Sequence, residues 1–190
     1  MSERLIIAIS GSTGPIYGVR LLEVLAEHFR SIEVHLILTS AARKTIEYEL
    51  SRDPDTVAEL AAVVHDEKNI GATIASGTFL TRGMIVAPCS IKSLSAIANS
   101  YNDTLVSRAA DVCLKERRPL TLLVRETPLH LGHLKLMTST TEAGATVMPP
   151  SPAFYHRPQT IEDIVDHTVI KMLDLHGLHV EGLIERWPGL

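Results

Sequence analysis

The stretch RLIIAISGSTGP, residues 4–15, decides the fold of this chain. Residues 4–10 form a nearly continuous apolar run, which is typical of a strand buried on both faces. A turn rich in glycine and hydroxyl groups follows at once. Pro15 then suits the first turn of a helix, because its missing N–H costs nothing there. The stretch therefore predicts a strand, a tight turn and a helix in direct succession.

The turn also predicts a ligand. Gly11 allows the backbone to approach a bound group closely, and the free N–H groups at a helix start favour a phosphate. Ser10, Ser12 and Thr13 add hydroxyl groups. The alternative is an ordinary strand-to-helix turn, since the motif does not match G-x-G-x-x-G, but its position after the first strand favours ligand binding.

Strand and helix patterns alternate along the rest of the chain. Further strands are expected at 34–39, 83–87, 120–124 and 145–148, and helices at 15–29, 41–49, 54–63, 91–98, 104–115, 129–142 and 161–176. Alternation of this kind predicts an α/β fold with three layers, doubly wound around a mostly parallel sheet. Ligands of such folds bind beyond the carboxyl ends of the strands.

The bulk properties narrow the class of protein. With 190 residues, of which 45% are hydrophobic, the chain is expected to form a single domain, residues 1–190. A net charge of −4 gives no broad basic field for nucleic acid or for an anionic membrane. No apolar run reaches the length of about 18 residues that a membrane span needs, and the N-terminus does not resemble a signal peptide. A cytoplasmic protein is expected.

Small polar segments recur where strands are expected to end. The turn Pro88-Cys89-Ser90 follows the strand at 83–87, Thr39 closes the strand at 34–39, and Ser76-Gly77 supplies a third segment upstream. Many hydroxyls and few carboxylates suit a flavin phosphate and ribityl chain, although each segment alone is also explained by helix capping. Cys89 lies beside a helix start, yet no histidine is near in sequence, so a small buried residue is favoured over a nucleophile.

Arg125-Glu126 follows the strand at 120–124, where ligands bind. A cation beside a carboxylate can hold an anionic leaving group and move a proton, which suggests phosphate-ester chemistry. His130 and His133 lack a third ligand at a motif spacing, so no metal site is predicted. Tyr155, after three prolines, and Trp187, the sole tryptophan, are candidates to wall an apolar pocket.

Several motifs together resemble the UbiX-type flavin prenyltransferases. They are GSTGPIYG (11–18), PCS (88–90), SRAADV (107–112), LKERRPL (114–120), RETP (125–128) and PPSPAFYHRP (149–158). The similarity covers nearly the whole chain. It implies a Rossmann-like flavoprotein that needs no metal and joins a dimethylallyl unit from dimethylallyl monophosphate to N5 and C6 of reduced FMN. The product would serve UbiD-type decarboxylases, including those of ubiquinone synthesis.

The resemblance also implies roles for residues. Catalytic roles fall to Glu126, Glu49 and Lys115. The substrate-binding set is Arg108, Lys115, Arg125, Glu126, Tyr155, Lys171 and Trp187. The cofactor-binding set is Gly11, Ser12, Thr13, Thr39, Ser76, Gly77, Pro88, Cys89, Ser90 and Arg125. Glu126 would pass a proton to the departing phosphate, and Trp187 matches a tail tryptophan that helps to cover the site.

Thr13 and Lys171 depart from the usual family pattern. Lys171 stands where the family has an arginine, and a lysine lacks the bidentate fork of that side chain. The resemblance implies an assembly of twelve subunits with FMN at the subunit contacts, so a homododecamer is expected. One alternative is a flavin-dependent cysteine decarboxylase, but Lys92 stands where that class has asparagine, and residues 72–81 contain no histidine. Another alternative is a non-catalytic, FMN-carrying accessory subunit.

Overall fold

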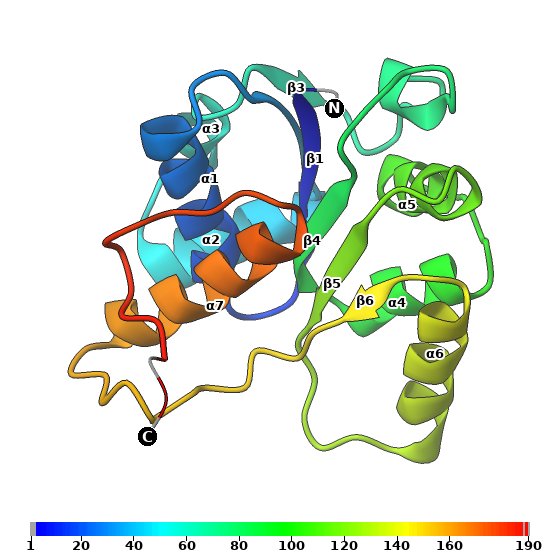
Figure 1. The fold of residues 1–190 in the computed structure, drawn as a ribbon. Helices are drawn as coiled ribbons and strands as arrows, with labels where there is room; N and C mark the ends of the chain where they lie inside the picture. Colours follow the sequence, from blue (N-terminus) through cyan, green and yellow to red (C-terminus); the bar gives the residue numbers. More distant parts are fainter. Residues whose placement is uncertain (1–2, 188, 190) are drawn as a thin grey trace.

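A six-stranded, entirely parallel sheet organises the chain in the computed structural model, which describes residues 3–187 and 189. The strands are β1 (Arg4–Ile9), β2 (Glu33–Leu38), β3 (Val63–His65), β4 (Met84–Cys89), β5 (Leu120–Val124) and β6 (Thr146–Val147). Their order is β3-β2-β1-β4-β5-β6, so the chain reverses its direction of winding between β1 and β4 (Figure 1). The three-layer, doubly wound prediction is confirmed, and the reversal point is where such folds bind ligands.

Helices cover both faces of the sheet (Figure 1). They are α1 (Ile16–His28), α2 (Ser40–Leu50), α3 (Pro54–Ala58), α4 (Ile91–Ala98), α5 (Leu105–Lys115), α6 (Leu131–Glu142) and α7 (Ile161–Leu175), with a 3₁₀ turn at Thr73–Ala75. α1 packs against α7, and α4 packs against α5 and α6. No helix among the described residues is long and apolar enough to cross a membrane.

The core consists of two clusters. One buries apolar side chains of β1, β2, α1 and α7, and the other those of β4, β5, α4 and α5. Alternate residues of β1 enter different clusters: Ile7 is in the first and Ile6 in the second. This division explains why the strands read as continuous apolar runs rather than as alternating ones.

The structure corrects one stretch of the predicted order. A helix was expected over 54–63, but α3 ends at Ala58, and Val63–His65 forms β3 at the edge of the sheet beside β2. Pro54 in the first turn and Asp53 as the N-cap start the helix as the sequence indicates. Pairing with β2 then decides the conformation of the last residues, and no local pattern reports such pairing.

Candidate active site

Three helices begin around one pocket at the carboxyl ends of the strands. Thr39, Ser90 and Thr104 are the N-caps of α2, α4 and α5, and each side chain accepts a hydrogen bond from a backbone N–H of its own first turn. All three residues line a pocket of about 180 Å³. Helix N-termini carry partial positive charge and free N–H groups, so their convergence favours an anion such as a phosphate.

Ser10 connects two of the turns around this pocket through hydrogen bonds. Its buried hydroxyl donates to the carbonyl of Pro88 at 2.8 Å and accepts from the N–H of Ser90 at 2.8 Å. The hydroxyl was expected to assist a phosphate, but these bonds give it a structural role between β1 and β4. Gly11 meets the start of α2, where an added Cβ would lie 2.2 Å from Cβ of Ala41. Glycine is therefore required there by packing.

Sequence reasoning missed three charged residues of this pocket. Lys92 lines it from the first turn of α4, while Glu67 and Asp103 line it from loops. Glu67 Oε1 accepts a hydrogen bond of 2.8 Å from the backbone N–H of Ser40, at the start of α2. A carboxylate from a loop after β3 could be found only once β3 itself was recognised. Asp103 precedes the N-cap Thr104, which is a readable signal of a helix start.

The turn after β1, residues 10–15, lies beside the segment that follows β5. Ser12 donates from its hydroxyl to the carbonyl of Arg125 at 3.1 Å, and the N–H of Gly14 donates to Glu49 Oε2 at 2.9 Å. Glu126 Oε1 accepts from the adjacent N–H of Thr127 at 2.9 Å. Two predicted site residues, Glu49 and Arg125, therefore contact the turn that contains Ser12, and Glu126 is the next residue after Arg125. Thr13 is exposed in the same turn.

Pro88 and Cys89 are buried at the end of β4. The position of the turn alone did not reveal this burial, and their role as cofactor contacts stays a prediction. Cys89 is 0% exposed, and burial raises the pKa of its thiol to about 12. A thiol of that kind is not a nucleophile at neutral pH, as the sequence indicated. Cys113 is likewise buried.

Ser76, Gly77 and Lys115 lie together elsewhere. Arg118, just before β5, donates to the carbonyls of Gly77 and Phe79, and a Cβ at Gly77 would lie 2.8 Å from Lys115 Nζ. Lys115 forms an ion pair with Glu116 and lines a pocket with Pro119, the residue before β5 begins. This group therefore stands at the amino ends of the strands, opposite Arg125 and Glu126. Ser76 lies in a segment that leads into β4 instead of following a strand, so the sequence alone did not show that it stands at this edge of the sheet.

Arg108 lies one turn after the N-cap Thr104 on α5. It approaches Asp111 at 3.4 Å, and Asn102 donates to the same carboxylate oxygen at 3.1 Å. The guanidinium is therefore held near the start of α5, on the side of the sheet where the strands end. Lys115 lies seven residues further along the same helix, at the opposite edge of the sheet.

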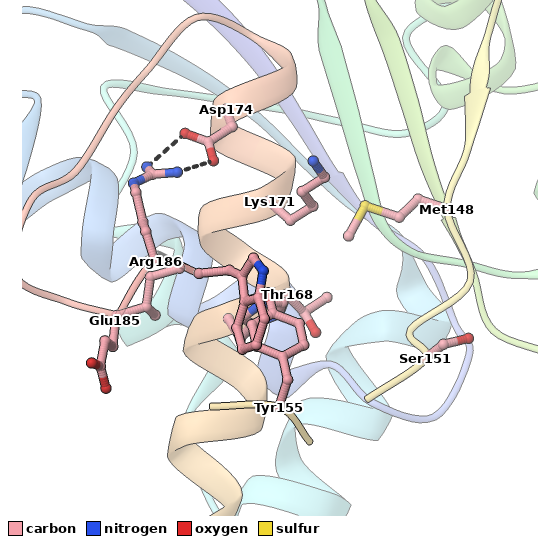
Figure 2. A pocket seen from close by; sticks show the side chains of 11 residues that line it. Met148, Ser151, Tyr155, Thr168, Lys171, Asp174, Glu185 and Arg186 are labelled. Carbon is pink, nitrogen blue, oxygen red and sulfur yellow. Dashed lines mark hydrogen bonds and ion pairs between the residues drawn. The ribbon is translucent and has the colours of Figure 1, made fainter. Parts of the chain in front are cut away.

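A third group lines a pocket of about 470 Å³ between α7 and the C-terminal tail (Figure 2). It contains Tyr155, Lys171 and Trp187, and the rings of Tyr155 and Trp187 meet edge to face with centroids 5.4 Å apart. His167, which sequence reasoning missed, lies 2.7 Å from the Tyr155 hydroxyl through Nε2. The signal in the sequence was its spacing. His167 lies four residues before Lys171, which places both side chains on the same face of the helix.

His130 and His133 pack their rings together with centroids 3.6 Å apart, and His130 Nδ1 accepts from the N–H of Gly132 as the N-cap of α6. Across the described part of the chain, no group of three His, Cys, Asp or Glu side chains is arranged to hold a metal ion.

Comparisons with known proteins agree with this geometry. The Flavoprotein family model matches residues 1–173. The flavin prenyltransferase UbiX of Escherichia coli K12 is 55% identical over 188 residues, which cover 98% of this chain and 99% of that protein. UbiX of Thauera aromatica is 53% identical over 186 residues, which cover 98% of this chain and 94% of that protein.

Solved structures are similar over the same length. A crystal structure of AnUbiX in complex with FMN and dimethylallyl pyrophosphate has a TM-score of 0.94 and 45% identity, and covers 98% of each chain. A dodecameric, FMN-dependent UbiX-like decarboxylase of Escherichia coli O157:H7 also has a TM-score of 0.94, with 45% identity and coverage of 98% of this chain and 100% of that one. The peptidyl-cysteine decarboxylase EpiD is 19% identical and shares only the fold. By sequence and by structure, this chain belongs to the UbiX family of flavin prenyltransferases.

Proposed function

We propose that this chain transfers a dimethylallyl group from dimethylallyl monophosphate to reduced FMN, and that residues 1–190 act as one flavin-binding domain. In this reaction the C–O bond of the allylic phosphate breaks and phosphate leaves with the electron pair. The five-carbon unit replaces the hydrogen on N5 and adds through its double bond to C6; the proton from N5 goes to the leaving phosphate, and the proton from C6 goes to the neighbouring carbon of the former double bond. The bound reduced flavin supplies the nucleophile, and the protein orients both reactants and stabilises the leaving phosphate.

The observation that carries the proposal is the convergence of three N-capped helices on one pocket. Thr39, Ser90 and Thr104 present their helix N-termini to it, which suits the flavin phosphate. At about 180 Å³ the pocket is smaller than the roughly 300–1,000 Å³ that encloses a whole small molecule. It therefore suits one end of FMN, and the ring system extends toward the first turn and Glu49.

Glu126 is the proposed proton donor to the departing phosphate. Arg125 is the proposed counter-charge to that phosphate. Both follow β5 beside the turn that contains Ser12, which accounts for a reacting centre next to the flavin. Tyr155 and Lys171 are the proposed ligands of the substrate phosphate, while the Trp187 ring covers the allyl group. Aromatic faces stabilise developing allylic cation character.

In this proposal, assembly of the oligomer brings three residues of a second subunit to the site: Lys115, Ser76 and Gly77. In one chain they lie at the edge of the sheet opposite Glu126, so a site that uses both must draw them from different subunits. The dodecameric structure of the Escherichia coli O157:H7 relative supports an oligomer of this kind. We propose a homododecamer whose active sites combine Lys115 of one subunit with Glu126 of another.

The alternative functions are less well supported. A cysteine-decarboxylase activity has only fold-level similarity behind it, at 19% identity for EpiD, and Lys92 lines the pocket where that class carries asparagine. A non-catalytic accessory subunit would not require Glu126 beside the flavin turn. The UbiD-type decarboxylase as recipient of the product and a cytoplasmic location both stay predictions of the family resemblance.

Mass spectrometry of the released flavin tests the proposal. The purified oligomer is incubated anaerobically with reduced FMN and dimethylallyl monophosphate, and in parallel with the diphosphate. We expect a flavin heavier by one five-carbon unit with the monophosphate. Bound but unaltered FMN, beside an active control enzyme, would contradict the proposal and favour the accessory function.

A further inference from the structure

His167 lies at the centre of an aromatic cluster next to the proposed substrate phosphate. Its Nε2 is 2.7 Å from the hydroxyl of Tyr155. The ring of His156 stacks on it with centroids 4.7 Å apart and planes 4° apart. Lys171 follows one turn later on α7, and His167, Tyr155 and Lys171 line the same pocket. Figure 2 shows Tyr155 and Lys171 on the sides of this pocket.

The Tyr155 hydroxyl has one hydrogen to donate. A neutral histidine whose Nε2 lacks a proton accepts that hydrogen, and the hydroxyl then presents only lone pairs to the pocket. When Nε2 carries a proton, it donates to the hydroxyl oxygen, and Tyr155 is free to donate to a phosphate. The protonation of His167 Nε2 therefore decides whether Tyr155 faces an anion as a donor or as an acceptor.

The surroundings favour the neutral form while no anion is bound. Partial burial lowers the pKa of His167, and the nearby His156 and Lys171 lower it further. The charged and titratable groups around the cluster are Tyr155 and His156 in the loop after β6, Asp163, Lys171 and Asp174 on α7, and Glu185 and Arg186 in the tail. Asp174 is already paired with Arg186, through two contacts of 2.8 and 2.9 Å.

We propose that His167 is a positioning residue of the phosphate site: it takes up a proton as a phosphate dianion binds and thereby turns the Tyr155 hydroxyl toward that phosphate. The proton supplies a second positive charge beside Lys171, whose single ammonium lacks the fork of an arginine. The inference rests on the proposed function, because it assumes that this pocket receives the phosphate of the allylic substrate.

The experiment compares the wild-type oligomer with His167→Gln, whose amide can still bond to Tyr155 but does not titrate. His28→Gln, on the surface of α1, is the matched control. The kcat and KM for dimethylallyl monophosphate are measured above pH 7, where the substrate phosphate, with a second pKa of about 6, is a dianion. Binding of the same compound to the protein loaded with oxidised FMN is followed by calorimetry in two buffers of different ionisation enthalpy.

We expect the wild-type KM to rise by about fivefold to tenfold between about pH 7 and 9, because one proton is coupled to binding. In His167→Gln the rise should be less than about twofold, with kcat nearly unchanged and proton uptake reduced. Thermal unfolding and FMN content check that the variant is intact, and His167→Phe, which carries no proton, should likewise show a KM that rises by less than about twofold over this pH range.

The outcomes separate the two proposals. If wild-type protein forms prenylated flavin but His167→Gln keeps its pH profile and its proton uptake, the role of His167 is wrong and the proposed function stands. If wild-type protein neither binds the monophosphate nor alters the flavin, the proposed function fails and the role of His167 fails with it. Binding with proton uptake that depends on His167, but without prenyl transfer, supports only the phosphate site.

Discussion

Glu126 has its carboxylate at the end of β5, where its nearest partner is the N–H of Thr127. Within the part of the chain that the structure describes, this carboxylate forms no ion pair, so it is available to a departing phosphate. We expect Glu126→Gln to retain FMN and to lower kcat for prenyl transfer by at least about a hundredfold, since positioned proton transfer contributes roughly 10²–10⁴-fold. Single-turnover mass spectrometry of the flavin measures the loss.

Glu27→Gln is the control for Glu126→Gln, because Glu27 is exposed on α1. It should match wild-type protein in FMN content and in rate. Unchanged turnover in Glu126→Gln would remove this residue from the mechanism.

Ser10 shows how a single hydroxyl positions the site without touching a ligand. Ser10→Ala would leave the buried N–H of Ser90 without its partner, whereas the Pro88 carbonyl still accepts from the backbone N–H of residue 10. We expect a loss of about 1–3 kcal/mol in the free energy of unfolding and weaker FMN binding. Denaturant titration checks the first and fluorescence titration the second. Ser139→Ala, on the surface of α6, should change stability by less than about 0.5 kcal/mol.

At the scale of elements, α7 is anchored by a buried histidine at its C-terminus. His176 Nε2 lies 3.1 Å from the Thr121 hydroxyl of β5, and burial lowers the pKa of His176 to about 4. The unfolded chain, with a histidine pKa of about 6.5, binds this proton more readily, so acid favours unfolding. Stability from this group is complete above about pH 6.5 and falls by about 3 kcal/mol as the pH drops to about 4.

His176→Gln tests that account through the slope of stability against pH. Between about pH 6 and 4.5 the slope should decrease by up to about 1.4 kcal/mol per pH unit relative to wild-type protein, as expected for one fewer proton taken up on unfolding. His28→Gln, whose side chain is on the surface of α1, should keep the wild-type slope. Equal slopes in all three proteins would mean that His176 does not titrate on unfolding.

The elements that the sequence predicted well are those with a strong local signal. β1, β2, β4 and β5 are continuous apolar runs, and the capped helices begin where Thr39, Ser90 and Thr104 indicate. β3 was missed because it has three residues at the edge of the sheet, and its conformation depends on pairing with β2. Such pairing is a tertiary effect that overrides local propensity.

Three of the predicted site residues, Ser12, Thr39 and Arg125, lie at the carboxyl ends of the strands, as their positions in the sequence indicate. Their roles stay predictions. Burial and spatial order could not be read from the sequence: Pro88 and Cys89 are buried at the end of β4, and Ser76 precedes β4, so in a single chain it lies at the opposite edge of the sheet. His167 and Glu67 can be identified as pocket residues only from the three-dimensional structure, because neither belongs to a local sequence motif.

For the molecule as a whole, the sheet separates two residues that the proposed reaction brings together. α5 begins at Thr104, beside the pocket at the carboxyl ends of the strands, and ends at Lys115, next to the residue that precedes β5. Glu126 follows β5 at the other end. Since the body of a packed sheet lies between Lys115 and Glu126, a single chain cannot place both on one phosphate. In the proposed mechanism, oligomerisation is then a requirement of catalysis.

Mixed oligomers test this requirement directly. Lys115→Ala and Glu126→Gln should each abolish prenyl transfer alone. When equal amounts of the two chains assemble together, about a quarter of the sites combine a wild-type Lys115 from one chain with a wild-type Glu126 from another, so about a quarter of the wild-type activity should return. Mixing preassembled variants without exchange of subunits is the control and should stay inactive. Coassembled variants that also stay inactive would place both residues of each site in one chain and contradict a shared active site.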